Sequence, residues 1–448
     1  MSKVTPLSGF PEFLPQDRIV ELEFLDAIRE TFELHGFASI ETRSVEPLEE
    51  LMRKGETAHE VYVLRRLQAD TDEGDAGVGL HFDLTVPLAR YVVEHQGHLN
   101  FPLRRYQIQR CWRGERPQEG RYREFTQADI DIIGRDELHL DADIEVTTVM
   151  AEALSRLPLP PITLRINNRK LIEGFYLGLG IGDPTGVMRG IDKLDKIGAE
   201  GIRAELDRLG LTGDQVQACL DLAQINRDDA SFADDVRKLG VTHPLLDTGL
   251  DELSQAVEAA APANSDRFRV VADLRIARGL DYYTGTIFEG FTEELGALSI
   301  CAGGRYDSLA NDGRSTYPGV GISLGITRLL APLIARGRID ADRSVPSCVL
   351  VALPDDASRP ASRDVAARLR SRGIPTEVAP AAAKYGRQIR HADRRGIPYV
   401  WFPPSADSTD AHQVKDIRSG DQVDADPDTW RPPAADLRPR IVTKELDT

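Results

Sequence analysis

The N-terminal part of the chain carries apolar residues at helical spacing. Four of them repeat at every fourth position, which places them on one face of a helix: Val20, Phe24, Ile28 and Phe32. The pattern predicts a helix over residues 17–35, with Asp17 as its N-cap and Gly36 as the residue that ends it. Residues 141–157 have an acidic start and helical spacing, so a helix is predicted there as well.

Alternating apolar and polar residues predict strands in the first half of the chain. Residues 101–134 alternate on both sides of a polar loop, which predicts a long antiparallel hairpin. Residues 60–95 are predicted to form two strands around a polar tip. On the second of these strands Asp83 and Thr85 would share one face.

Changes in pattern divide the chain into domains. Residues 167–265 have helical periodicity and many acidic side chains, and strand patterns return after them. After Cys348 strands and helices alternate, which predicts a small α/β domain with a partly parallel sheet. The predicted segments are 1–166 and 266–340 as two parts of one domain, 167–265 as a helical insertion and 347–448 as the α/β domain.

Composition excludes several classes of protein. No run of about 18 apolar residues is present, so no membrane span is expected. The first residues lack the apolar core of a signal peptide. The four cysteines are widely spaced without a CxxC pair, which argues against a disulfide framework and a structural zinc site. We therefore expect a reducing, cytoplasmic location.

The distribution of charge changes what the net charge of −17 implies. Such an acidic total argues against a dedicated nucleic-acid-binding protein. However, residues 104–123 hold seven arginines against two glutamates, and residues 384–396 hold five basic residues against one aspartate. Residues 221–265, by contrast, carry a net charge of −6. The two basic patches suit binding of nucleic acid along a restricted track, although each also fits an ordinary solvated face.

The arginine-rich hairpin is the first candidate site. Arg113 ends one strand, and Arg121 or Arg123 begins the return, so the hairpin can hold an anionic ligand from two sides. Phe125 adds a flat apolar surface. The alternative is a hairpin tip held by salt bridges.

Three further stretches carry candidate chemistry. Asp83 and Thr85 suit an ammonium group, although an edge strand ending in a proline explains them equally well. Residues 278–285 place an arginine beside a glycine and two adjacent tyrosines, which on a strand would point to opposite faces. Half-buried sheet tyrosines are the alternative. In residues 319–329 glycines lead into a helix that carries Arg328 in its first turns, which suits a polyphosphate.

In this order and spacing, these stretches resemble the class II aminoacyl-tRNA synthetases, and among them the histidyl-tRNA synthetase family, over essentially the whole chain. The helix over 17–35 and the strand up to Pro47 look like motif 1, the dimer-forming segment. The hairpin around Arg113 looks like motif 2, and GVGISLGITRL at 319–329 looks like motif 3. The histidine-specific signals are RGLDYYTG and CAGGRYD, at 278–285 and 301–307.

This resemblance implies an α+β fold, with a class II catalytic core whose antiparallel sheet is flanked by helices. A helical insertion and a C-terminal α/β anticodon-binding domain complete it. It also implies ATP-dependent activation of L-histidine to histidyl-adenylate and transfer of histidine to tRNA(His). Magnesium would accompany ATP, and no dedicated metal site is expected.

The resemblance further implies roles for individual residues. For ATP, Arg113 would hold the α-phosphate, Arg121 and Arg328 the distal phosphates, Phe125 the adenine ring and Glu115 the adenine amino group. Arg278 would be a second catalytic cation at the α-phosphate and the substrate carboxylate. For histidine, Asp83, Thr85 and Gln127 would bind the ammonium and carboxylate region, Asp131 and Tyr283 the imidazole nitrogens, and Tyr282 would line the wall.

Binding of tRNA is expected at two places. Arg116 and Gln118 would lie near the acceptor end of the tRNA. In the C-terminal domain Lys384, Arg387 and Arg390 would contact phosphates. The chain would be a homodimer, and no membrane is involved.

Two alternatives remain open. A non-catalytic relative of this family is the regulatory subunit of ATP phosphoribosyltransferase in histidine biosynthesis, which keeps the core fold without aminoacylation. A tRNA-binding protein that has lost activation is the other. The first is disfavoured by an intact set of Arg113, Arg278 and Arg328 and by the full C-terminal domain, and the second because the pocket residues show no damage.

Overall fold

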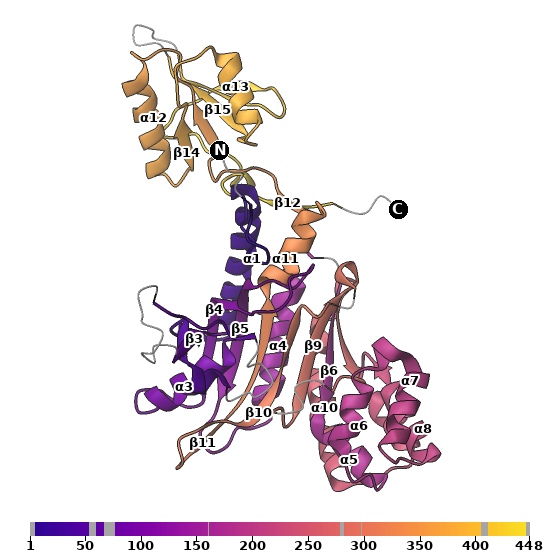
Figure 1. The fold of residues 1–448 in the computed structure, drawn as a ribbon. Helices are drawn as coiled ribbons and strands as arrows, with labels where there is room; N and C mark the ends of the chain where they lie inside the picture. Colours follow the sequence, from indigo (N-terminus) through magenta and orange to yellow (C-terminus); the bar gives the residue numbers. More distant parts are fainter. Residues whose placement is uncertain are drawn as a thin grey trace. The chain divides into compact units, whose positions relative to one another are not determined.

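The computed structural model describes residues 5–52, 60–66, 77–159, 161–277, 282–296, 298–404 and 411–444, and it divides into two compact units (Figure 1). The larger unit holds residues 1–11 and 25–332, and the smaller holds 12–24 and 333–448. The predicted α+β class is confirmed, because a large central sheet is flanked by helices. The bounds of the four segments predicted from the sequence stay predictions.

The larger unit is built on a nine-stranded sheet. Its order is β1 (Ala38–Ser39), β4 (Leu103–Trp112), β5 (Glu124–Ile133), β11 (Thr316–Gly325), β10 (Cys301–Asn311), β9 (Thr286–Thr292), β6 (Ile162–Asn168), β8 (Phe268–Asp273) and β7 (Asn226–Arg227). The six strands from β4 to β6 are antiparallel, and parallel pairs occur at β1–β4 and β6–β8. The long hairpin predicted over 101–134 is therefore confirmed as β4 and β5.

Two long helices confirm the helical patterns. Helix α1 (Pro15–Leu34) buries all four of the apolar residues that repeat along it, and α4 (Asp141–Arg156) packs against β5 and β11. The prediction that Asp17 is the N-cap of α1 was wrong, because the helix begins at Pro15. Asp17 lies inside the first turn, where its carboxylate accepts a hydrogen bond from the backbone N–H of Leu14 at 3.3 Å.

The two strands predicted over 60–95 form only in part among the described residues of that range. β3 (Val78–Leu80) pairs antiparallel with the segment around Val63 through a single bridge, with backbone hydrogen bonds from Leu64 to Val78 and from Leu80 to Tyr62. β3 also pairs with β2 (Val45–Pro47), and α2 (Leu48–Leu51) follows β2. Residues 85–95 form helix α3 (Thr85–His95) instead. The Asp83 carboxylate accepts a hydrogen bond from the Val86 N–H at 3.0 Å, as a helix cap does, and Pro87 fits the first turn because no N–H partner is needed there. Asp83 and Thr85 therefore do not share a strand face.

The insertion between β6 and β8 is helical, as predicted. Its helices are α5 (Arg169–Gly178), α6 (Pro184–Ile191), α7 (Leu194–Arg208), α8 (Gly213–Ala223), α9 (Phe232–Lys238) and α10 (Pro244–Ala260). α5 and α10 meet through two glycines. A Cβ on Gly174 would lie 2.2 Å from the backbone of Leu246, and one on Gly249 would lie 2.2 Å from the backbone of Leu171. The backbones of the two helices can approach this closely only because neither glycine carries a side chain.

The smaller unit contains the predicted α/β domain. Its sheet runs β14 (Thr376–Val378), β13 (Val349–Val351), β15 (Tyr399–Phe402), β16 (Gln413–Asp416) and β17 (Gln422–Asp424). The first three strands are parallel and the last two pairings antiparallel. Helix α12 (Arg359–Ser371) packs on one face around Trp401, and α13 (Tyr385–Asp393) packs on the other around Leu350. A short ribbon joins β12 (Ile339–Ala341) to β18 (Ile441–Thr443).

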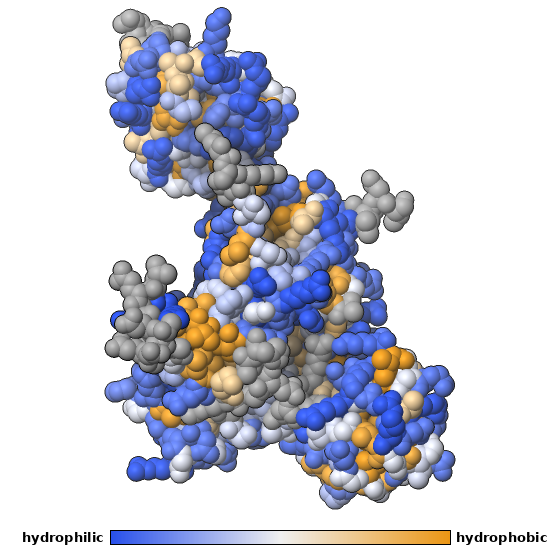
Figure 2. All heavy atoms as spheres, viewed as in Figure 1, coloured by the Kyte–Doolittle hydropathy of each residue, from blue (hydrophilic) through white to orange (hydrophobic). Residues whose placement is uncertain are grey.

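The surface of the larger unit carries an apolar patch. Figure 2 shows apolar residues gathered where β3 lies. The exposed large apolar side chains of this region are Met52, Val63 and Val78. No helix among the described residues is long and apolar enough to cross a membrane.

The close crossing of α5 and α10 can be tested. Gly249→Ala is expected to lower the free energy of unfolding by about 1–3 kcal/mol, because the new methyl group forces two backbones apart. Gly213→Ala, at the start of α8, is the matched control. Its Cβ meets no atom within 4 Å, so its stability should stay equal or rise. Denaturant unfolding measures both, and equal stabilities for the two variants would contradict the crossing.

Candidate active site

A cavity of about 190 Å³ opens on the polar face of the sheet in the larger unit. Its walls come from β5, β10, β11, the β4–β5 loop, the segment before α3 and the segment before β9. It brings together most of the predicted ATP- and histidine-site residues: Asp83, Thr85, Arg113, Glu115, Arg121, Phe125, Gln127, Asp131, Tyr282, Tyr283 and Arg328. Arg278 lies outside the described residues.

A polar row across three strands forms the floor of the cavity. On β5, Gln127, Asp129 and Asp131 alternate and so face the same side. On β4 their register partners are Gln109, Gln107 and Arg105, and on β11 they are Gly325, Ser323 and Gly321. Strand pairing thus fixes the position of each polar group relative to the next.

Asp131 lies at the inner end of this row. Its carboxylate pairs with the fully buried Arg105 guanidinium at 2.5 Å and accepts a hydrogen bond from the Tyr306 hydroxyl at 2.6 Å. A Cβ on Gly321 would lie 2.1 Å from an Asp131 oxygen, so the carboxylate can rest on β11 only because that position is a glycine. Burial and the adjacent carboxylate raise the pKa of Tyr306 well above its usual range, so this hydroxyl stays a donor.

Tyr282 and Tyr283 both line the cavity, in keeping with the resemblance and not with the opposite faces expected of neighbours on a strand. They precede β9 and do not lie on a strand, so their rings need not point to opposite sides. The ring centroids are 4.3 Å apart. Burial raises the pKa of Tyr283, which keeps its hydroxyl protonated. Its ring lies against Gly304 of β10, where a Cβ would be 2.9 Å away.

The opposite end of the cavity is basic. The guanidinium of Arg113 lies 5.0 Å from the centre of the Phe125 ring, and its Nε donates to the Phe82 carbonyl at 2.9 Å. Arg328 projects from the first turn of α11 (Ile326–Ala335) and donates to the carbonyl oxygens of Gly120 and Ser299, at 2.8 and 3.1 Å. These bonds hold the β4–β5 loop, which carries Arg121, against the helix entrance.

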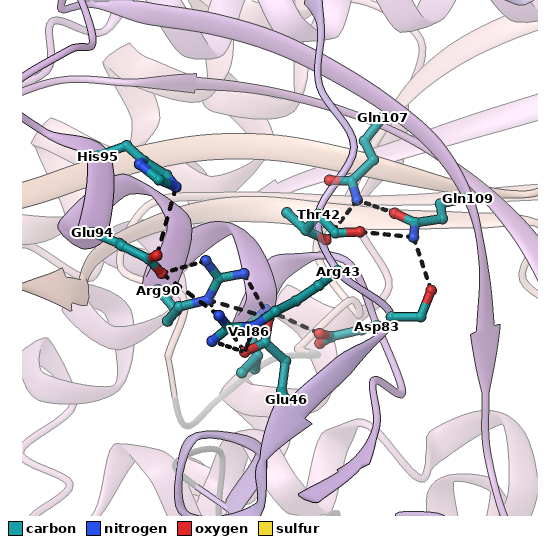
Figure 3. Close-up of polar contacts among 11 residues, drawn as sticks. Thr42, Arg43, Glu46, Asp83, Val86, Arg90, Glu94, His95, Gln107 and Gln109 are labelled. Carbon is teal, nitrogen blue, oxygen red and sulfur yellow. Dashed lines mark hydrogen bonds and ion pairs between the residues drawn. The ribbon is translucent and has the colours of Figure 1, made fainter.

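The segment that carries Asp83 and Thr85 is anchored from behind by charged and polar groups (Figure 3). The fully buried Glu46 carboxylate pairs with Arg90 of α3 at 2.7 Å and with Arg43 at 3.1 Å. Arg90 also bonds Glu94 at 2.7 Å. Beside them, the amides of Gln107 and Gln109 bond each other and the segment that begins at Thr42. Helix α3 is therefore fixed to β2 and β4, and its N-terminus is held at the cavity.

Asp129 was not predicted as a site residue. It lies at the centre of the row, only 2% exposed, and its Oδ1 has no hydrogen-bond partner among the described residues. Burial raises its pKa to about 7; Arg105 opposes the rise and Asp131 adds to it. The alternation of Gln127, Asp129 and Asp131 on one predicted strand is the sequence signal that could have identified it.

Several hairpin arginines serve structure, so the salt-bridge interpretation holds for part of the patch. Arg104 pairs with Glu145, Arg110 pairs with Glu124 at 2.8 Å, and Arg105 is the buried partner of Asp131. The predicted tRNA contacts are all exposed, and none of them is among the residues that line the cavity. They are Arg116 and Gln118 on the β4–β5 loop, and Lys384, Arg387 and Arg390 at α13.

Comparisons with known proteins agree over nearly the whole chain. The family description histidyl-tRNA synthetase matches residues 9–329, and the description anticodon binding domain matches residues 347–429. A histidine–tRNA ligase of Cutibacterium acnes is 57% identical and covers 99% of this chain and 99% of its own length.

Solved structures show the same fold. A histidyl-tRNA synthetase from Nostoc sp. PCC 7120 superposes with a TM-score of 0.84 at 33% identity, covering 95% of this chain and 97% of that one. A protein from Bacillus halodurans, described as an ATP phosphoribosyltransferase regulatory subunit/histidyl-tRNA synthetase, gives a TM-score of 0.71 at 21% identity, covering 87% and 97%. At this identity the second likeness speaks for the fold alone.

The anchor behind α3 can be tested by substitution. Arg90→Met is expected to lower the free energy of unfolding by about 3 kcal/mol, because it removes the closest cation from a fully buried glutamate. The control is Arg110→Met, whose side chain is 63% exposed and whose loss should cost under about 1 kcal/mol. Chemical denaturation compares the two, and similar small losses would show that Glu46 does not depend on Arg90.

Proposed function

The chain belongs to the histidyl-tRNA synthetase family, and from this membership we propose that it activates L-histidine with ATP and transfers the histidyl group to the 3′ end of tRNA(His). The observation that carries the proposal is the polarity of the cavity. Asp83, Asp129 and Asp131 line one end, and Arg113, Arg121 and Arg328 line the other, where Glu115 is the one carboxylate among the described lining residues. An amino acid with a cationic group fits the first end and a polyphosphate fits the second.

The acidic end accounts for selection of histidine. The imidazole ring has two nitrogens that need partners, and Asp131 and the Tyr283 hydroxyl supply an acceptor and a donor. Asp83, Thr85 and Gln127 are assigned to the backbone groups of the amino acid. A buried polar pocket of this kind rejects substrates that leave its groups unpaired.

The basic end accounts for activation. The carboxylate oxygen of histidine attacks the α-phosphorus of ATP, a new P–O bond forms, and the bond to the β-phosphate breaks to release pyrophosphate. Arg113 and Arg278 are assigned to the α-phosphate, and Arg121 and Arg328 to the distal phosphates, where fixed cations offset the developing charge. The hydroxyl of the terminal ribose of tRNA then attacks the histidyl carbonyl, and AMP leaves.

Magnesium takes most of its ligands from phosphate and water when it binds with ATP. Among the described residues no group of three His, Cys, Asp or Glu side chains could hold a metal ion. We therefore assign the ion to the nucleotide, with no step of the mechanism routed through it.

The partners follow from the family and the surface. Arg116, Gln118 and the cations of α13 are assigned to tRNA because they are exposed and basic or polar. A homodimer is supported by the apolar patch beside β3, since a patch of exposed apolar side chains is typical of a protein interface. A cytoplasmic location stays a prediction. The regulatory-subunit alternative is disfavoured because a subunit that does not aminoacylate tRNA needs neither the arginines that line the cavity nor the exposed cations on α13.

Activation and tRNA binding can be separated within one loop. Arg113→Ala is expected to lower histidine-dependent ATP–pyrophosphate exchange by about 100-fold or more, because a cation at the reacting phosphate is lost. Arg116→Ala, three residues away and exposed, should keep exchange within about twofold and raise the KM for tRNA in aminoacylation. No histidine-dependent exchange in the folded wild-type chain would refute the proposed function.

The helix α13 gives a second test. Replacing Arg387 and Arg390 together by alanine is expected to weaken tRNA binding. The slope of log Kd against the logarithm of the salt concentration should also fall by about 0.7 for each lost phosphate contact. Arg363→Ala, exposed on α12 across the same sheet, is the control and should leave both quantities unchanged. Exchange should be normal in all of these variants. Equal tRNA affinity in the double variant and the control would remove α13 from the binding surface.

A further inference from the structure

Two buried acceptors in the floor of the cavity have no donor among the described residues. They are Gln127 Oε1 and Asp129 Oδ1, and their residues are 8% and 2% exposed. Both residues line the cavity. Leaving a buried acceptor unpaired is costly, so two such acceptors on residues that line one cavity indicate a ligand that brings donors.

The two acceptors are oriented by one hydroxyl. The amide nitrogen of Gln127 donates to Ser323 Oγ on β11, and the Ser323 hydroxyl bonds the Asp129 carboxylate. With the nitrogen of the Gln127 amide bonded to Ser323, its oxygen is the acceptor that has no partner among the described residues. Strand register keeps Ser323 opposite Asp129, so the arrangement depends on the pairing of β5 with β11.

The ring-binding end does not need Asp129. Asp131 and Tyr283 lie there, with Tyr306 donating to Asp131. Alternate residues of a strand are about 6.8 Å apart, so Asp129 lies one such step from Asp131 toward Gln127 and the arginine end. A neutral imidazole has one N–H, whereas an ammonium group has three.

We propose that Asp129 is a substrate-contacting residue, and that its Oδ1, together with Gln127 Oε1, accepts hydrogen bonds from the α-ammonium group of bound histidine. The inference rests on the proposed function and adds a binding residue to it. Asp83 is then one of several acceptors and not the main counter-charge, in keeping with the use of one of its oxygens to cap α3.

The groups around Asp129 make its contribution dependent on pH. It faces Arg105 on β4, Asp131 on its own strand, Ser323 on β11 and Asp83 before α3. The pKa of Asp129 is raised to about 7, so the carboxylate is protonated in part of the free protein near neutral pH. Only the ionised carboxylate carries the negative charge that pairs with the ammonium group, so histidine binding should weaken as the pH falls below about 7.

The experiment uses three ligands and the full chain without ATP. Histidine carries the ring, the ammonium and the carboxylate; histidinol lacks the carboxylate; imidazole-4-propionate lacks the ammonium. Calorimetry of Asp129→Asn is expected to show about 10- to 100-fold weaker binding of histidine and histidinol, and a change of less than about threefold for imidazole-4-propionate. Asp207→Asn, an exposed carboxylate on α7, controls for the loss of charge and should change none of the three.

The outcomes are distinct. Equal weakening of all three ligands would mean that Asp129 acts on the ring or on the fold, and no weakening of any would remove it from the site; either overturns the inference. Failure of the wild-type chain to bind histidine would instead refute the proposed function.

If the Asp129→Asn variant does not fold, a measurement on the wild-type chain tests the same inference. The ammonium group lowers the ring pKa of histidine relative to that of imidazole-4-propionate. The affinity of each ligand between pH 5.5 and 8.5 is therefore first corrected for the ring titration of that free ligand, and the ratio of the corrected affinities is then taken. The ratio should fall by up to about tenfold per pH unit below about 7. A flat ratio would overturn the inference. In exchange assays Asp129→Asn should raise the KM for histidine and leave the KM for ATP unchanged.

Discussion

The register of β4, β5 and β11 is the constraint on which the site depends. It sets Arg105 beside Asp131 and leaves Gly321 beneath the carboxylate, and two residues along it sets Ser323 opposite Asp129. A shift of one residue would turn every one of these groups to the other side of the sheet. Because buried charges are costly unless paired, the same register that forms the site also holds the centre of the sheet in one arrangement.

The negative charge on the floor of the cavity is only partly neutralised, because the register of β4, β5 and β11 places more carboxylates than cations there. Four carboxylates line the cavity, namely Asp83, Asp129 and Asp131 together with Glu115 of the β4–β5 loop. In the polar row a single buried guanidinium, that of Arg105, pairs with Asp131 and also lowers the pKa of Asp129. The remaining negative charge, and the two acceptors without a partner among the described residues, favour a cationic ligand. At the other end arginines are held in place by carbonyl oxygens, so their charge is positioned before any phosphate arrives. Positioned charge of this kind needs little rearrangement during the reaction.

Much of the fold could be predicted because its signals are local. The four-residue spacing of α1 and the alternation of β4 and β5 are visible in the sequence, and the resemblance supplied the family. Helix α3 was mistaken for a strand because its first turn, with Asp83 as a cap and Pro87 behind it, also reads as an extended segment ending in proline. The two tyrosines were assigned to opposite faces because a strand was assumed where the chain forms a turn.

The part of the site that could not be predicted depends on contacts between distant strands. Arg105 looked like one arginine among seven, and only strand pairing shows that it is buried against Asp131. Asp129 could be identified as a site residue only from the structure, in which its Oδ1 has no hydrogen-bond partner among the described residues. The most direct test of the polar cavity is a crystal structure with histidine and a non-hydrolysable ATP analogue. The imidazole should lie at Asp131 and Tyr283 and the phosphates at Arg113 and Arg328. Phosphates at the carboxylate end, or a ring remote from Asp131, would contradict it.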